Sequence, residues 1–310
     1  MKPKILLLVL FVAMCVPSWS QARGDLNGDG QVDVTDVSIA IDIVLGKDSN
    51  DNYGGLADLS GDGSVDVTDV SLIIDIVLGK STQTNQTFTV NGVSFKMIAV
   101  EGGTFMMGHD NPGSNFRNEK PAHSVTLSGF SIGETEVTQE LWQAVMGSNP
   151  SYFTGNLQRP VEQVTWNDCH TFLTKLNALT GKNFRLPTEA EWEFAARGGN
   201  KSKGYEYAGS DNASEVAWYD TAGQPHPVAT KAPNELGLYD MSGNVHEWCE
   251  DWFGSYSEDA QTNPKGPQSG SARIFRGGSW CSGWRACWVT HRSYYAPTRN
   301  DVILGLRIVL

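Results

Sequence analysis

Two twelve-residue segments near the start of the chain carry oxygen-bearing side chains at spacings that suit a hard cation. In residues 25–36 such side chains occupy positions 1, 3, 5, 9 and 12: Asp25, Asn27, Asp29, Asp33 and Asp36. Gly30 stands at position 6, where a calcium loop turns sharply, and Gln31 would offer its backbone carbonyl at position 7. Calcium in proteins takes about six to eight oxygen ligands in this kind of arrangement. The segment therefore predicts a calcium site.

The second segment, residues 58–69, repeats this pattern 33 positions later. Its corresponding residues are Asp58, Ser60, Asp62, Ser64, Asp66 and Asp69, with Gly63 at the turn. Carboxylates crowded on one short loop repel one another, so a bound cation is close to obligatory. We therefore expect two calcium ions in this part of the chain.

An apolar stretch with helical spacing follows each loop. Val37, Ala40, Ile41 and Val44 recur at this spacing after the first loop, and Val70, Ile73, Ile74 and Val77 do so after the second. Gly46 and Gly79 stand where each helix should end. Because two short helices bury little apolar surface, we expect the metal to help hold this fold together.

The duplicated loop–helix unit of residues 21–80 resembles the type I dockerin, whose loops also end in Asp rather than Glu. The resemblance implies a small all-α module that binds a cohesin, often in polysaccharide-degrading assemblies. It also implies that the helix starts, Val34-Thr35 and Val67-Thr68, matter for that binding. Because the two copies are nearly equal, two binding orientations are expected.

A second group of chemically active residues lies in the segment Gly-Gly-Ser-Trp-Cys-Ser-Gly-Trp-Arg-Ala-Cys, residues 277–287. Its thiols, Cys281 and Cys287, could bind a soft metal ion such as Cu(I) as thiolates. The alternative is that they form a disulfide or remain buried thiols. Cys169 and Cys249 are further possible partners, and four cysteines allow three full pairings.

Several motifs outside this segment occur in a distinctive order. They are Gly103–Gly108, Arg-Leu-Pro-Thr-Glu-Ala-Glu-Trp-Glu at 185–193, Gly-Leu-Tyr-Asp-Met-Ser-Gly-Asn-Val at 237–245, Glu247-Trp248, Arg-Gly-Gly-Ser-Trp at 276–280 and Gly305–Arg307. Over about residues 90–310 the chain thereby resembles the formylglycine-generating enzyme, or sulfatase-modifying factor, family. The resemblance implies an α+β, C-type-lectin-like fold with much irregular structure. It also implies at least one calcium site, formed by Asp240, the carbonyls of Gly243 and Val245, and Glu247.

Enzymes of this family oxidise a sulfatase cysteine to formylglycine, using copper held by two thiols. By resemblance, Ser279 and Cys287 match the catalytic serine and the second thiol. Ser282 stands where the first thiol belongs, and Cys281 comes one residue early. On an extended chain such a shift turns a side chain to the opposite face. His246 also replaces a tryptophan that the enzymes keep beside the oxygen pocket.

Two functions are therefore open for the large domain. One is a copper-dependent oxidase that activates sulfatases. The other is a recognition domain for a protein, peptide or glycan, because residues 281–303 are rich in aromatic and short polar side chains. The shifted thiol favours binding over oxidation.

The spacing of apolar and capping residues in the rest of the chain predicts the helices and strands that position these residues. Helices are expected over 138–147 and 167–179, with a third at a capping box formed by Thr188 and Glu191. Strands are expected within 88–99, and irregular loops with short strands after Gly199. A polar stretch at 81–87 reads as a linker, which places the large domain at 88–310.

Composition and the N-terminus indicate an exported protein. The 310 residues carry a net charge of −12, and such an acidic chain disfavours nucleic acid as a partner. Lys2 and Lys4 precede an apolar run over 5–16, which predicts a signal peptide cleaved after Ser20. The sequence offers no other candidate for a membrane span.

Overall fold

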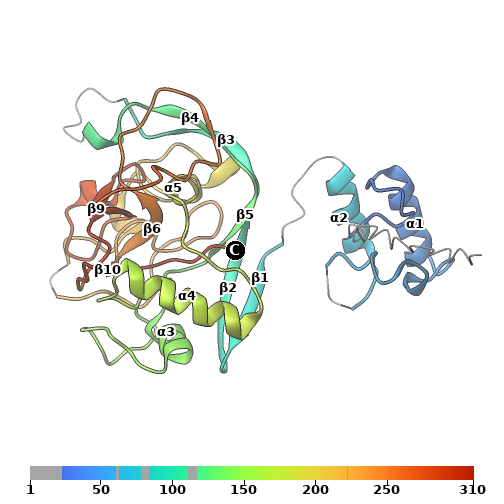
Figure 1. The fold of residues 1–310 in the computed structure, drawn as a ribbon, viewed down its shortest axis with the longest axis horizontal. Helices are drawn as coiled ribbons and strands as arrows, with labels where there is room; N and C mark the ends of the chain where they lie inside the picture. Colours follow the sequence, from blue (N-terminus) through green and yellow to red (C-terminus); the bar gives the residue numbers. More distant parts are fainter. Residues whose placement is uncertain (1–22, 61–62, 78–83, 111–116, 222) are drawn as a thin grey trace, which may run out of the picture. The chain divides into compact units, whose positions relative to one another are not determined.

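The computed structural model describes residues 23–60, 63–77, 84–110, 117–221 and 223–310. The expected signal peptide with its cleavage after Ser20, the expected ligand Asp62, the helix end at Gly79 and the start of the 81–87 linker lie outside the described residues. The chain divides into two compact units, residues 1–82 and 83–310. Each unit is described by itself below (Figure 1).

The first unit contains two α-helices of equal length, α1 (Val34–Val44) and α2 (Val67–Val77), with the short 3-10 helix η1 (Asn50–Tyr53) between them. Asp33 caps α1 by accepting from the backbone N–H of Thr35, and the Asp36 carboxylate accepts from the N–H of Asp33. This reciprocal pair satisfies N–H groups that the first helical turn leaves without partners. The two expected helices are therefore present, and each begins at position 10 of its loop.

A small apolar core joins the two helices. Its buried members are Leu26, Ala40, Ala57 and Ile73. The core that the described residues of this unit form is therefore small.

Three sheets form the second unit. The first contains β1 (Gln86–Val90), β2 (Val93–Val100) and β5 (Phe130–Gly133), all antiparallel. The second contains β3 (Gly103–Met107), β4 (His123–Leu127) and β7 (Gln261–Thr262). The third follows the order β10 (Leu304–Gly305), β6 (His246–Trp252), β8 (Arg273–Arg276) and β9 (Ser293–Tyr295), so β9 lies at its edge.

The helices of this unit are α3 (Gln139–Met146), α4 (Trp166–Thr180), α5 (Glu189–Ala196) and the single turn α6 (Ala213–Val216). Short 3-10 turns are η2 (Arg117–Glu119), η3 (Gly199–Lys201) and η4 (Trp284–Cys287). The three expected helices are confirmed, and Thr188 with Glu191 forms the expected capping box. α4 begins at Trp166, one residue before the prediction, because Thr165 is its N-cap.

The first strand begins earlier than expected. β1 starts at Gln86, two residues before the predicted domain start, and its backbone pairs with Met97 of β2. Polar side chains concealed this start, because strand pairing uses backbone groups and leaves the side chains of an edge strand in solvent.

Two apolar clusters form the core of the second unit. In one, α3 and α4 pack on β1 and β2 (Figure 1). The ring centroids of Trp142 and Phe172 lie 4.9 Å apart in this cluster, and the rings are stacked. In the other, Trp192 of α5 is fully buried between the second and third sheets. The structure is thus α+β with long irregular segments, as expected.

Candidate functional site

The segment after β8 forms a small polar cluster with the first residue of β6. Ser279 is fully buried, and its Oγ lies 2.7 Å from Ser282 Oγ. Ser282 Oγ in turn lies 3.4 Å from Nε2 of His246. The side chain at position 282 therefore links the expected catalytic serine to the histidine that replaces the family's tryptophan.

His246 is a neutral member of this cluster. It is buried, and its Nδ1 atom has no hydrogen-bond partner. Burial lowers the pKa of His246 to about 3, because the charged imidazolium would lose its hydration. The cluster therefore offers hydroxyls and a neutral imidazole, not a cation.

The two candidate thiols lie in different environments. Cys281 is exposed, and its Sγ lies 3.7 Å from Ser279 Oγ. Cys287 is buried in an apolar cluster with Tyr207, Ala213 and Val216, and burial raises the pKa of its thiol to about 12. Cys169, Cys249, Cys281 and Cys287 are all free thiols, so the structure contains none of the disulfides considered above among its described residues.

A glycine makes the position of Cys287 possible. Gly278 has a φ of +79°, and a Cβ atom there would lie 2.6 Å from Cys287 Sγ. Only a residue without a side chain permits this approach. The Gly-Gly pair therefore holds Cys287 against the loop that carries Ser279.

These donors fit a copper(I) centre poorly. Such a centre needs two thiolates that converge on one ion. Here the thiol of Cys287 is buried and protonated, whereas that of Cys281 is exposed. The side chain that contacts Ser279 Oγ at 2.7 Å is the hydroxyl of Ser282, not a thiol.

One expected calcium ligand of the large domain, Glu247, is paired with the buried Arg307. Both carboxylate oxygens of Glu247 accept from Arg307, at 2.7 and 2.9 Å, and one also accepts from Trp192 Nε1 at 2.6 Å. Asp240 accepts from the N–H of Ala229 through Oδ2, whereas its buried Oδ1 has no partner.

A third carboxylate at this place was not predicted. Glu136 is 1% exposed and accepts from Val245 N and from Asn244 Nδ2, which lies 108 positions later in the sequence. Burial, followed by repulsion from Asp240 and Glu247, raises the pKa of Glu136 well above its usual range. Burial also raises the pKa of Asp240 to about 6.

The calcium ligand set therefore fits only in part. The unpartnered Oδ1 of Asp240 beside a second buried carboxylate suits a cation. Glu247 does not, because the guanidinium of Arg307 already neutralises it. Within the described residues, no group of three or more His, Cys, Asp or Glu side chains is placed to hold a metal ion.

Carboxylates of the expected calcium loops in the first unit bind backbone N–H groups of their own loops. Asp36, at loop position 12, accepts from the N–H groups of Leu26 and Asn27. Asp25, at position 1, accepts from Gly28 and Gly30. In the second loop, Asp69 likewise accepts from Ser60 and Asp66. In both loops the carboxylates therefore cross the loop to backbone N–H groups, and their role as calcium ligands stays a prediction.

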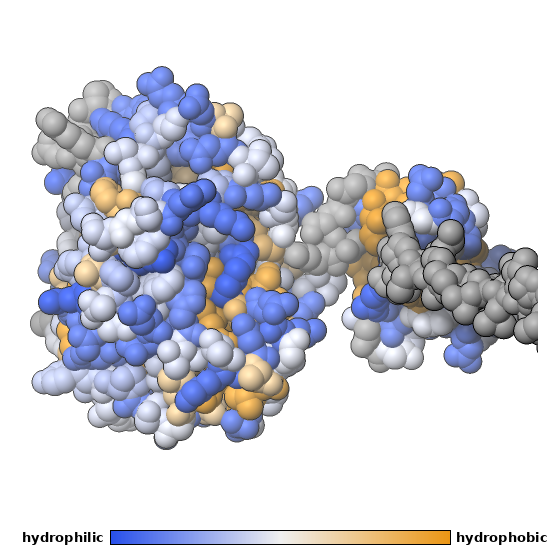
Figure 2. Space-filling model, viewed as in Figure 1, coloured by the Kyte–Doolittle hydropathy of each residue, from blue (hydrophilic) through white to orange (hydrophobic). Residues whose placement is uncertain are grey.

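Apolar side chains are exposed on both helices of this unit at equivalent positions. Val34 and Val67 are 68% and 70% exposed, and Ile41 and Ile74 are 41% and 38% exposed. On the face drawn in Figure 2, apolar surface lies over α2. The expected contact residues at the two helix starts are therefore accessible.

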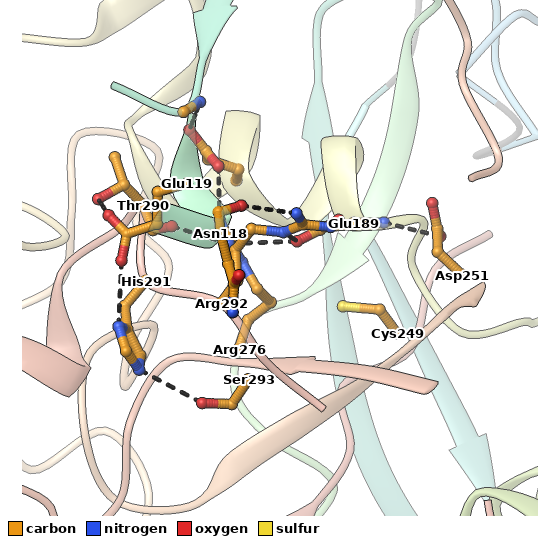
Figure 3. Close-up of polar contacts among 12 residues, drawn as sticks. Asn118, Glu119, Glu189, Cys249, Asp251, Arg276, Thr290, His291, Arg292 and Ser293 are labelled. Atoms are coloured by element: carbon orange, nitrogen blue, oxygen red, sulfur yellow. Dashed lines mark hydrogen bonds and ion pairs between the residues drawn. The ribbon is translucent and has the colours of Figure 1, made fainter. Parts of the chain in front are cut away.

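An ionic network fixes the third sheet to α5 (Figure 3). Arg292 pairs bidentately with Glu189, at 2.6 and 2.7 Å, and Arg276 bonds Glu193 and the carbonyls of Val289 and Thr290. Charge-assisted contacts of this kind define geometry strongly, although the buried Nε of Arg276 itself has no partner. The network therefore positions the chain on both sides of the Ser279 cluster, although the sequence motifs gave no pairing for these residues.

Comparison with known proteins agrees with this architecture. Residues 82–310 match the sulfatase-modifying factor enzyme 1-like domain, and residues 23–78 match the dockerin type I domain. The chain therefore belongs to the sulfatase-modifying factor family and carries a dockerin, a module that binds calcium and implies a cohesin partner.

Individual relatives match more than half of the chain. The chain is 35% identical to chaperone protein LppX of Paenibacillus barcinonensis, over 70% of this chain and 90% of that protein. It is 37% identical to the formylglycine-generating enzyme of Streptomyces coelicolor, over 54% of this chain and 57% of the enzyme. Among solved structures, Treponema denticola variable protein 1 superposes with a TM-score of 0.68 at 34% identity, covering 73% of this chain and 99% of that one.

None of the helices in the described part of the chain has the length and apolar character that a bilayer span requires.

Proposed function

We propose that this chain is an exported protein, recruited by its dockerin to a cohesin-bearing, polysaccharide-degrading assembly, whose large domain binds a ligand rather than oxidising cysteine. The observation that carries the proposal is the identity of the side chain at position 282. A hydroxyl, not a thiol, bridges Ser279 and His246. Hydroxyl oxygen is a hard donor that suits Cu(I) poorly.

The state of the thiols supports the same reading. A metal-bound cysteine must be deprotonated, and the raised pKa of buried Cys287 opposes this. The exposed Cys281 alone leaves no pair of thiolates. Copper-dependent oxidation remains the alternative, favoured by the retained Ser279 and Cys287 and by the formylglycine-generating relative.

A ligand surface for the large domain would lie near this cluster. Trp284, Tyr294 and Tyr295 are 43%, 43% and 38% exposed. Aromatic rings give large contact area at low cost in side-chain entropy, which suits recognition of a protein, peptide or glycan.

The recruiting surface would lie on the first unit. The exposed apolar residues Val34 and Val67 occupy equivalent starts of α1 and α2. Because each helix presents the same pattern, either could contact a cohesin.

The oxidase alternative is tested by incubating the protein with Cu(I), a reductant and a Cys-x-Pro-x-Arg peptide, with mass spectrometry to detect the aldehyde. We expect no conversion and no tight copper binding by the wild-type protein. The double variant Cys281→Ser with Ser282→Cys restores the thiol spacing of the enzymes, and we expect it to gain copper binding.

The single variant Cys281→Ser is the matched control, since it removes the exposed thiol without restoring the spacing. If the wild-type protein converts the peptide and Cys281→Ser abolishes this conversion, then Cys281 acts as a copper ligand despite its shifted position. That result would overturn the proposal.

A further inference from the structure

A serine, a histidine and a glutamate form a hydrogen-bonded chain next to the ionic network of Figure 3. Ser293 Oγ lies 3.3 Å from His291 Nε2, and His291 Nδ1 lies 3.1 Å from Glu119 Oε1 (Figure 3). With the ring proton on Nδ1 donated to Glu119, Nε2 accepts from the serine hydroxyl. This is the order of contacts in which a base activates a nucleophile and an acid orients the base.

Ser293 is the first residue of edge strand β9, and His291 lies two residues before it. Arg292 is buried and faces α5, whereas His291 and Ser293 on either side of it are partly exposed. In such an extended segment, side chains two residues apart lie on the same side, which places His291 and Ser293 together. An edge strand also presents N–H groups outside the ladder, the kind of donor that stabilises an oxyanion.

Glu119 is held in place from a distant part of the sequence. It belongs to η2, is 1% exposed, and lies 172 positions before His291. Its second oxygen, Oε2, accepts from Thr290 Oγ1 at 2.9 Å and lies 2.8 Å from His109 Nε2. Arg292 also donates to the carbonyl of Asn118 at 2.7 Å, which fixes η2 against β9.

This surrounding keeps Glu119 ionised. Burial alone would raise its pKa, but hydrogen bonds from His291 and Thr290 and the charges of His291 and Arg276 lower the pKa below its ordinary value. An ionised carboxylate on Nδ1 is what stabilises an imidazolium that forms when the base takes a proton.

We propose that Ser293, His291 and Glu119 form an acyl-transfer site that hydrolyses carboxylic esters. Ser293 Oγ bonds to the ester carbonyl carbon while its proton passes to His291 Nε2. The bond between that carbon and the alcohol oxygen then breaks, and the alcohol leaves with this proton. Water attacks the acyl-serine, gives a proton to His291, and Ser293 regains it as the carboxylic acid departs.

The surroundings of Ser293 indicate an ester with a short acyl group. Ser293 lies in a strand beside Tyr294 and Tyr295, both exposed. A surface nucleophile of this kind suits a small acyl group, and the aromatic rings suit the alcohol part of the ester. This proposal involves neither copper nor the thiols, so its test can fail without affecting the function proposed above.

The full-length protein is tested with a fluorophosphonate, which phosphonylates activated serines, and with 4-nitrophenyl acetate. We expect an adduct on the peptide that contains Ser293, and ester hydrolysis that falls about a hundredfold in Ser293→Ala and in His291→Gln, the scale of general-base catalysis. Glu119→Gln should lower the rate while leaving Ser293 reactive.

Ser257→Ala is the matched control, because Ser257 is an exposed serine bonded to Asp259 and lies outside this chain of contacts. Removing the hydroxyl of a partly exposed serine leaves the core intact, so Ser293→Ala decides the matter even if Glu119→Gln fails to fold. Absence of a Ser293 adduct, or equal hydrolysis by wild type and Ser293→Ala, would overturn the proposal.

Discussion

Asp251 of β6 is a buried carboxyl whose pKa is changed by its surroundings. It is 5% exposed, and its Oδ2 accepts from the backbone N–H of Glu189 at 2.9 Å. Burial raises the pKa of Asp251 to about 8, and the acids Glu189, Glu191 and Glu250 add to this effect. In the folded protein this carboxyl therefore keeps a proton that the unfolded chain releases.

This retained proton predicts a specific pH dependence of stability. Because the folded-state pKa is raised, the contribution of Asp251 is fully present below about pH 4 and is lost as pH rises toward 8. The free energy of unfolding should fall by up to about 1.4 kcal/mol per pH unit in that window. Asp251→Asn keeps an acceptor for Glu189 but cannot titrate, so it should flatten the decline.

Urea unfolding at pH 5, 6, 7 and 8 measures this effect. The variant and the wild type should differ little at pH 5, and the variant should be more stable at pH 8. Glu101→Gln, at an exposed acid, should leave the slope unchanged. Parallel curves for wild type and Asp251→Asn would contradict the assignment.

At the scale of elements, α5 shows how acidic residues can form an interior helix. All eight of its residues are buried, including Glu189, Glu191 and Glu193. Arginines from three other segments neutralise these carboxylates: Arg185, Arg276 and Arg292. A buried charge is tolerated when it is paired and hydrogen-bonded, so the helix acts as an ionic anchor for the third sheet.

The helices α1 and α2 depend on a different kind of support. They share a small apolar core, and their first turns are built from loop carboxylates that calcium would neutralise. Removal of calcium should therefore leave those carboxylates in mutual repulsion and unfold both helices.

Hydrogen exchange of the full chain, with and without a chelator, tests this prediction. Amides in α1 and α2 should lose protection, whereas those in α4, which packs in an apolar core, serve as the internal reference. Asp29→Ala should lower protection in α1 at limiting calcium. Equal protection of α1 and α2 in both conditions would refute the dependence.

At the scale of the whole molecule, the chain contains two units with separate cores. The boundary falls between residues 82 and 83, which agrees with the start of the family match at 82. Each unit has its own apolar clusters and its own proposed surface. Recruitment and ligand binding should therefore be separable.

A chain shortened to residues 82–310 should melt at the same temperature as the large domain of the full chain, yet should not be retained by an immobilised cohesin. In the full chain, Val34→Asp and Val67→Asp should each keep retention, because the other helix can still bind. The double variant should lose it. Retention of residues 82–310, or aggregation of that fragment, would contradict the division of roles.

Features that depend on residues a few positions apart could be predicted from the sequence alone. Loop spacing, capping residues and helix-ending glycines act over a few positions, so the two loops and the ends of α3 and α5 follow from residues such as Thr138, Gly147 and Thr188. The motif order likewise indicated the family and the α+β fold. The start of β1 was less accurate, because backbone pairing leaves little trace in side-chain type.

Only the tertiary structure determined which side chains the site residues contact. It placed Ser282 rather than Cys281 between Ser279 and His246, because the turn after β8 sets which side chain faces inward. It also brought Glu136 beside Asp240 and Arg307, and Glu119 beside His291. These partners lie more than a hundred positions apart, and no local pattern records which distant charge will neutralise a buried one. Their pairing is settled only when folding removes water and leaves each buried polar group to find a partner.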